Sequence, residues 1–247
     1  MGKVDYSANP NQRTPCVLVL DASSSMNARP PGGGKKAIDA LNEGLRTLNE
    51  QLREDDTALT RIQLAIVSVG GPNDDAEIMM GMTDATNFKP FELQSDGTTP
   101  LGKGIQIALD LLEETKSDLR SAGISYTRPW MIIISDGQPT DNTDTWRQST
   151  AECWQAEADK KVTIYPIGVD GADFDKLAEI SSETPPMDLN RIKFNELFVW
   201  LSNSLGVYSR SRPGDSVQLP STDPWRNVKV RHHQLDHANR ILFPELP

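Results

Sequence analysis

The sequence predicts an α/β fold in which helices cover both faces of a mainly parallel β-sheet. The chain has 247 residues, enough for one α/β domain with a sizeable core. Short uncharged runs rich in Val, Ile and Leu alternate along it with segments whose apolar residues repeat at helical spacing. Strands that alternate with helices are joined by crossovers into a parallel sheet. One antiparallel strand is expected at the sheet edge, because a turn over 70–75 connects the strand before it directly to the run at 76–80.

The expected strands are the short apolar runs, two of which end at an aspartate. They cover 16–21, 61–69, 76–80, 130–136, 162–169 and 185–189. Asp74 and Asp75 lie in the turn before 76–80, where we expect a solvated hairpin tip and no ligand role.

Helices are expected to alternate with these strands, and the first two carry Leu, Ile and Ala on one face with a period near 3.6. The expected helices cover 35–53, 101–114, 145–160, 173–180 and 194–205. Two Pro residues and three Gly residues predict a mobile loop over 28–34, and 55–58 is expected to be a break. Thr140 or Asp141 is the expected N-cap of the helix that begins near 145.

The first buried strand ends in a cluster of oxygen-bearing side chains, Asp21, Ser23 and Ser25. Open α/β sheets place ligands at the carboxyl ends of their strands. A carboxylate and two hydroxyls are hard oxygen donors, which suit Mg²⁺. The alternative is structural, because Asp and Ser also cap the helix that follows a strand.

Two later segments repeat this pattern of polar residues. The strand over 130–136 ends in Asp136-Gly137, and the polar turn over 95–102 places Thr98 and Thr99 before a helix. Each segment alone is compatible with an ordinary turn or cap. Together with the first cluster, they give three loops with oxygen ligands and no competing Cys or His.

In this order, Asp-x-Ser-x-Ser, Thr-x-Leu-Gly and Ile-Ser-Asp-Gly resemble the metal-ion-dependent adhesion site of von Willebrand factor A (VWA) domains. The resemblance covers residues 14 to 208 and implies a Rossmann-like fold. It divides the chain into an N-terminal arm (1–13), a VWA domain (14–209) and a C-terminal extension (210–247). In that family two serines and a threonine coordinate the ion, and two aspartates complete the shell, often through water.

Carried over by position, the resemblance gives one set of metal ligands, with Thr98 as the alternative to Thr99. The set is Asp21, Ser23, Ser25, Thr99 and Asp136. The implied ion is Mg²⁺, with Mn²⁺ or Ca²⁺ as alternatives. Integrin-type domains follow the serines with acidic residues for an adjacent ion, whereas this chain has Met26-Asn27, so a second adjacent metal is not expected.

The implied function is a metal-dependent protein-interaction module whose cation is completed by a partner's Glu or Asp. The three motifs supply no His, Lys or Cys as a base, so we predict that the protein is not an enzyme. A metal-dependent hydrolase or phosphatase that uses Asp21 or Asp136 as its base remains an alternative.

The segment Gly137-Gln-Pro-Thr-Asp141 resembles the tellurium-resistance-associated, TerY-like branch of the family. That resemblance implies a bacterial stress-response or signalling complex with a Ser/Thr kinase and a PP2C-type phosphatase. An accessory subunit of an AAA+ ATPase complex is the alternative setting.

Composition restricts the classes of binding partner and the expected cellular location. The net charge of −10 disfavours nucleic acid and anionic membranes. No apolar run approaches the roughly 20 residues of a membrane span, and the N-terminus lacks the apolar segment of a secretory signal. Cys16 and Cys153 are expected as buried free thiols, so we predict a cytoplasmic protein.

Beyond residue 209 the sequence changes in character. We expect a linker over 210–215 and a possible added edge strand over 216–220. His232, His233 and His237 have a spacing that is only a weak indication of a zinc site, which needs three or four protein ligands. An exposed tail or a partner-binding segment is the preferred interpretation.

Overall fold

A computed structural model describes residues 9–29, 33–169, 171–189, 193–211 and 217–226. In these residues a six-stranded sheet has the order β3-β2-β1-β4-β5-β6. Its strands are β1 (Thr14–Ala22), β2 (Ile62–Gly70), β3 (Asp75–Asp84), β4 (Trp130–Ser135), β5 (Thr163–Gly168) and β6 (Met187–Asp188). Only β3, at one edge, pairs antiparallel. The predicted fold class is therefore confirmed, although β3 is longer than the expected 76–80.

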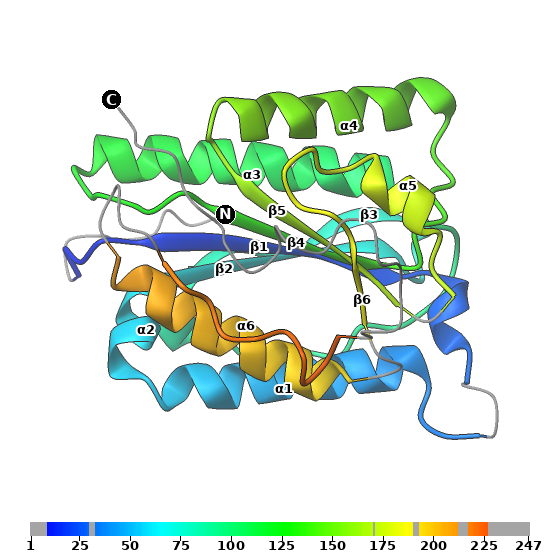
Figure 1. The fold of residues 1–247 in the computed structure, drawn as a ribbon, viewed down its shortest axis with the longest axis horizontal. Helices are drawn as coiled ribbons and strands as arrows, with labels where there is room; N and C mark the ends of the chain where they lie inside the picture. Colours follow the sequence, from blue (N-terminus) through cyan, green and yellow to red (C-terminus); the bar gives the residue numbers. More distant parts are fainter. Residues whose placement is uncertain (1–8, 30–32, 170, 190–192, 212–216, 227–247) are drawn as a thin grey trace.

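The helices lie on the two faces of this sheet, with α3 and α4 on one face and α1 and α6 on the other (Figure 1). Their bounds are α1 (Ala37–Arg53), α2 (Asp56–Arg61), α3 (Leu101–Ser121), α4 (Thr143–Ala158), α5 (Phe174–Ala178) and α6 (Phe194–Ser209). Short 3-10 turns follow β1 and β3, η1 (Ser24–Asn27) and η2 (Ala85–Asn87). None of the helices described is both long and apolar enough to cross a membrane.

Strand β1 shows how the core is divided into two layers. Its side chains alternate between the faces, so Leu18 and Leu20 pack with α1 and α6, whereas Val17 and Val19 pack with α3 and α4. All four are fully buried, as expected for a central strand covered on both sides.

Two expectations about local structure were wrong. The expected break after Asp55 is the short helix α2, because the Asp55 carboxylate accepts hydrogen bonds from the amides of Thr57 and Ala58 and caps it. Residues 217–220 form no strand, and Ser216 lies outside the described residues. The histidines His232, His233 and His237 also lie outside them.

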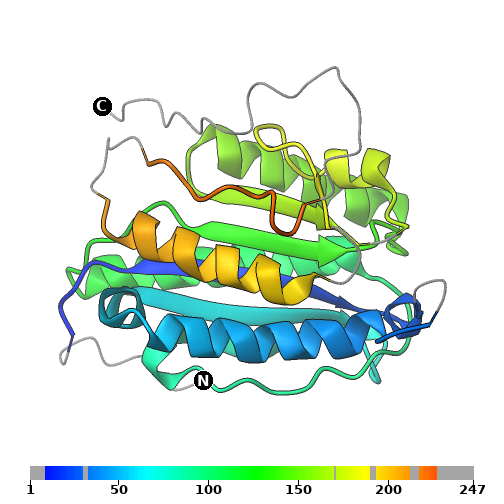
Figure 2. The same cartoon turned by 60° about the horizontal axis from the view of Figure 1, so that its bottom comes forward.

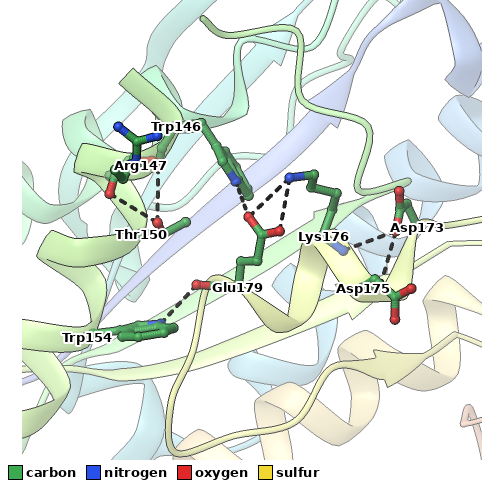
Figure 3. Close-up of polar contacts among 9 residues, drawn as sticks. Trp146, Arg147, Thr150, Trp154, Asp173, Asp175, Lys176 and Glu179 are labelled. Atoms are coloured by element: carbon green, nitrogen blue, oxygen red, sulfur yellow. Dashed lines mark hydrogen bonds and ion pairs between the residues drawn. The ribbon is translucent and has the colours of Figure 1, made fainter. Parts of the chain in front are cut away.

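Figure 3 shows how α5 is fixed against α4. The Glu179 carboxylate accepts hydrogen bonds from Trp146 Nε1 and from Lys176 Nζ, and its backbone carbonyl accepts one from Trp154 Nε1 at 2.9 Å. Asp173 caps α5 through the amides of Asp175 and Lys176. The amide of Asp173 donates in turn to the Asp136 carbonyl at 2.7 Å, so this packing supports the loop that follows β4.

Candidate metal site

The first predicted loop begins inside the sheet. Asp21 is fully buried near the carboxyl end of β1, between β2 and β4. Its Oδ1 accepts a hydrogen bond from the Ser23 amide at 2.9 Å. The turn η1 then places the hydroxyl oxygens of Ser23 and Ser25 2.8 Å apart. Ser23 makes no side-chain cap bond, and α1 begins later with Lys36 as its N-cap, so the helix-cap alternative for this cluster is wrong.

The second carboxylate lies at the end of the neighbouring strand. Strands β1 and β4 run parallel and end at the same side of the sheet (Figure 2), and Asp136 follows directly on β4. Ser135, the last residue of β4, donates from its hydroxyl to Asp21 Oδ2 at 2.7 Å. The Asp136 side chain is itself held by the Gln138 amide, which donates to Oδ1 at 3.1 Å.

The two carboxylates influence one another. Burial raises the pKa of Asp21 above its ordinary value, and the charge of Asp136 raises it further. Hydrogen bonds from Ser23 and Ser135 act in the opposite direction. A cation between two neighbouring carboxylates offsets both the burial cost and the repulsion, so these residues fit a metal ion.

The threonine turn distinguishes its two threonines. The Thr98 hydroxyl donates to Asp74 Oδ1 at 2.7 Å, and the Thr98 amide donates to the same oxygen. Asp74 is exposed, in agreement with a solvated hairpin tip. Thr99 is 5 % exposed, and its amide donates to Thr140 Oγ1, in the loop after Asp136, at 3.1 Å. Thr99 is therefore buried and joined to the Asp136 loop, whereas the Thr98 hydroxyl is bound to Asp74 at the surface.

The Asp21 loop and the threonine turn are also joined to each other. The Ser24 amide donates to the Gly97 carbonyl at 3.0 Å, and the Ser95 hydroxyl donates to the Ser23 carbonyl. Gly70, at the end of β2, lies beneath both loops. A Cβ there would come within 2.5 Å of the Thr98 carbonyl oxygen and 2.9 Å of Ser23 Cα.

The expected N-cap of α4 was wrong. Asn142 caps this helix, because its Oδ1 accepts from the amides of Asp144 at 3.1 Å and Thr145 at 2.9 Å. Asp141 instead accepts hydrogen bonds from the amides of Gly102 and Lys103, in the first turn of α3. Sequence spacing gave no indication of this contact, because Asp141 and α3 are far apart in the chain.

Sequence reasoning also missed two supporting residues, Ser135 and Gly70. Ser135 was inside the motif that carried the resemblance, and its place next to a strand-end carboxylate was an available signal. The role of Gly70 depends on loops that approach it from elsewhere in the fold. The Gly70-Gly-Pro sequence predicted a turn but not this close approach.

The donor set restricts the kind of ion. The described part of the chain holds no group of three or more His, Cys, Asp and Glu side chains that could bind a metal. An ion at these loops would therefore depend on hydroxyl oxygens in addition to Asp21 and Asp136. Such a set favours a hard cation.

Solved structures with the same fold include two bacterial pilus proteins and a mussel protein. The pilus adhesin SpaC from Lactobacillus rhamnosus GG has a TM-score of 0.62 and 15% identity, with 81% of this chain and 32% of that one covered. For the minor pilin PilB from Streptococcus sanguinis the TM-score is 0.56 and the identity is 12%, with 79% of this chain and 62% of that one covered. For proximal thread matrix protein 1 from the mussel byssus, with a zinc-occupied MIDAS motif, the TM-score is 0.50 and the identity is 17%. The match covers 78% of this chain and 47% of that one.

At these identities the likeness establishes the fold alone, and the chain spans about half the length of the mussel protein. No curated protein sequence matches the chain significantly. The family model described as von Willebrand factor type A domain matches residues 16–196, which is most of the chain. The chain therefore belongs to the von Willebrand factor type A domain family.

Proposed function

We propose that this VWA domain binds Mg²⁺ through Asp21, Ser23, Ser25, Thr99 and Asp136, and that a protein partner completes the site with a Glu or Asp. The observation that carries the proposal is the pair of hydroxyl oxygens of Ser23 and Ser25, 2.8 Å apart and directly after the buried Asp21. A bound divalent cation would supply a Lewis-acidic centre able to accept a carboxylate oxygen from outside the chain.

The chain's own residues prepare this site in two ways. Ser23 and Ser135 hold both oxygens of Asp21 in place, so the buried carboxylate needs little reorganisation when it meets an ion. Ser25 is exposed, whereas Ser23 and Asp21 are buried, so the cluster runs from the interior to the surface. A partner would approach from the Ser25 side.

We propose binding at this site in preference to catalysis. The side chains that hydrogen-bond to Asp21 or perturb its pKa are those of Ser23, Ser135 and Asp136, and none is a His, Lys or Cys. VWA domains generally act as interaction modules, which agrees with this choice.

The finer setting is also part of the proposal. The Gln-Pro-Thr-Asp segment after Gly137 supports a TerY-like bacterial complex with a Ser/Thr kinase and a PP2C-type phosphatase, and an AAA+ ATPase is the alternative partner. Cys16 and Cys153 are buried free thiols, which supports a cytoplasmic location. Affinity purification with and without Mg²⁺, followed by mass spectrometry, would distinguish a kinase and phosphatase from an ATPase.

Calorimetric titration of the full chain with Mg²⁺ and with Mn²⁺ tests metal binding. We expect saturable binding by the wild type, at least tenfold weaker binding by Asp21→Asn and Ser25→Ala, and no change for Asp144→Asn. Ser25 and Asp144 are both exposed, so neither of their variants should disturb the fold. Wild-type affinity in both Asp21→Asn and Ser25→Ala, with unaltered circular dichroism, would contradict the proposed site.

A further inference from the structure

We propose that Thr140 and Asp141 are positioning residues, which hold Thr99 in place relative to Asp136 and so set the affinity for the cation. Neither residue belongs to the predicted ligand set. The inference rests on the proposed function and extends it to the loop that follows β4.

Thr140 and Thr99 are joined by a reciprocal pair of hydrogen bonds. The Thr140 amide donates to the Thr99 carbonyl at 2.9 Å, and the Thr99 amide donates to Thr140 Oγ1 at 3.1 Å. Both polar groups of the Thr99 backbone are therefore bound to one residue of the Asp136 loop. The position of the Thr99 side chain depends on that loop.

Asp141 holds the helix that begins just after Thr99. Its Oδ2 accepts from the Gly102 amide at 2.7 Å, and its Oδ1 accepts from the Lys103 amide at 3.1 Å. The N-cap position of α3 is Pro100, which makes no side-chain cap bond. Asp141 therefore supplies from another loop the acceptor that the helix lacks, with a charge that suits a helix N-terminus.

Gly102 permits this approach. A Cβ at Gly102 would lie 3.2 Å from Asp141 Cγ and 3.0 Å from Ser149 Oγ, so any side chain there would press on the carboxylate. The absence of a side chain at Gly102 thus lets the Asp136 loop approach the first turn of α3 closely.

These four hydrogen bonds connect the two loops into one unit. Asp136, Thr140 and Asp141 belong to the same short loop, and Thr99 is held by that loop at its backbone and through α3. Loss of Asp141 would free the first turn of α3 and widen the range of positions open to Thr99. Outer partners of metal ligands commonly change metal affinity about 10–100-fold.

The decisive comparison is between Asp141→Ala and its neighbour Asn142→Ala. Asn142 also caps a helix from this loop through two amides, but that helix is α4, and the Asn142 side chain makes no hydrogen bond to Thr99 or α3 among the described residues. Both variants should lower the melting temperature in EDTA by about 2–4 °C. We expect the Kd for Mn²⁺, measured by calorimetry, to rise about tenfold or more in Asp141→Ala and to stay within twofold of wild type in Asn142→Ala.

Thr140 provides a second, independent comparison. Thr140→Val removes the acceptor for the Thr99 amide and keeps the shape of the side chain, so we expect a raised Kd for Mn²⁺. Thr140→Ser keeps the hydroxyl and should restore wild-type affinity. In EDTA, amide hydrogen exchange at Thr99 should be faster in Thr140→Val, and at Gly102 and Lys103 in Asp141→Ala.

The outcomes separate this inference from the proposed function. If the wild type binds Mn²⁺ and Asp141→Ala and Thr140→Val bind it equally well, the positioning role is overturned and the metal site stands. If the wild type binds neither Mg²⁺ nor Mn²⁺, the proposed function is overturned and this inference falls with it. Equal losses of affinity in Asp141→Ala and Asn142→Ala would show a general effect of stability and would also overturn the positioning role.

Discussion

At the scale of single residues, two fully buried acids of this protein depend on serine partners. Asp21 is fully buried and retains hydrogen bonds from Ser23 and Ser135, while Glu157 is fully buried and bonded to Ser181 and Ser182. Burial of a carboxylate is costly unless its oxygens find donors. We therefore expect substitution of the serines that bind these two acids to lower the stability of the fold.

Ser135→Ala should lower the free energy of unfolding by about 1–3 kcal/mol, because it removes a buried donor to Asp21. The Ser135 oxygen also accepts from the Gly137 amide at 3.1 Å, which would lose its partner. Urea denaturation measures the loss. Ser204→Ala is the matched control, since Ser204 is fully buried but its hydroxyl has no hydrogen-bond partner among the described residues. Equal losses in the two variants would count against the assigned role of Ser135.

Glu157 predicts a dependence of stability on pH. Burial raises the pKa of Glu157 above the ordinary 4.5, against the hydrogen bonds from Ser181 and Ser182, and the charge of Glu183 adds to the rise. Above the unfolded pKa the folded state still binds a proton that the unfolded state has released. This contribution to stability is therefore complete below pH 4.5 and is lost as the pH rises through the folded pKa.

The measurement compares wild type with Glu157→Gln, which cannot titrate. The free energy of unfolding of the wild type, relative to the variant, should fall as the pH rises above 4.5 and through the raised folded pKa of Glu157. Because both proteins share every other titrating group, the difference isolates Glu157. A difference that does not change with pH would show that the acid is not perturbed.

At the scale of elements, two loops of the candidate site meet beside Gly70, the last residue of β2. The Asp21 loop and the threonine turn are joined by backbone hydrogen bonds, and both approach Gly70 closely. Gly70 has a φ of +85°, which an L side chain rarely adopts. The position thus combines an unusual backbone conformation with a lack of space.

Gly70→Ala tests how much the lack of space matters. The control is Gly123→Ala, which has a φ of +70° but no atom within 4 Å of the added Cβ. Gly123→Ala should lower the free energy of unfolding by about 1–2 kcal/mol through backbone strain alone. Gly70→Ala should cost a further 1–3 kcal/mol or so, because the Cβ would displace Thr98 and Ser23.

Mg²⁺ affinity provides a second readout for these two variants. It should weaken in Gly70→Ala, whose new Cβ presses on the loop of Ser23, and stay unchanged in Gly123→Ala. Equal stability and equal affinity in the two variants would contradict the close approach of the loops.

At the scale of the whole molecule, the described segment 217–226 contributes to the core. Trp225 is fully buried, and its ring centroid lies 5.3 Å from that of Trp200 on α6. Trp200 Nε1 donates to the Pro220 carbonyl at 2.9 Å, and Lys193 Nζ donates to the Pro224 carbonyl at 2.9 Å. The described part of the extension therefore packs on the last helix of the domain.

Trp225→Ala should lower the free energy of unfolding by about 3–5 kcal/mol, as expected for a large side chain removed from a core. Trp154→Ala is the control, because Trp154 is 49 % exposed, and it should cost about 1 kcal/mol or less. Chemical denaturation followed by circular dichroism measures both. A small loss in Trp225→Ala would show that the extension is energetically separate from the domain.

The fold class and the approximate positions of the buried strands could be predicted from the amino-acid sequence alone. Apolar runs such as 16–21 and 130–136 predicted buried strands, because burial on both faces requires continuous hydrophobicity. The acidic and hydroxyl residues at their ends indicated a site, since parallel strands bring their carboxyl ends to one edge.

Which of these residues support one another became clear from the three-dimensional arrangement alone. It showed that Asp141 caps α3 and not α4, that Ser135 holds Asp21, and that Gly70 gives room to two loops. The physical reason is that hydrogen bonds and close contacts depend on distance in space. Local patterns report the conformation of a segment, whereas partners remote in the chain are chosen by how the segments pack.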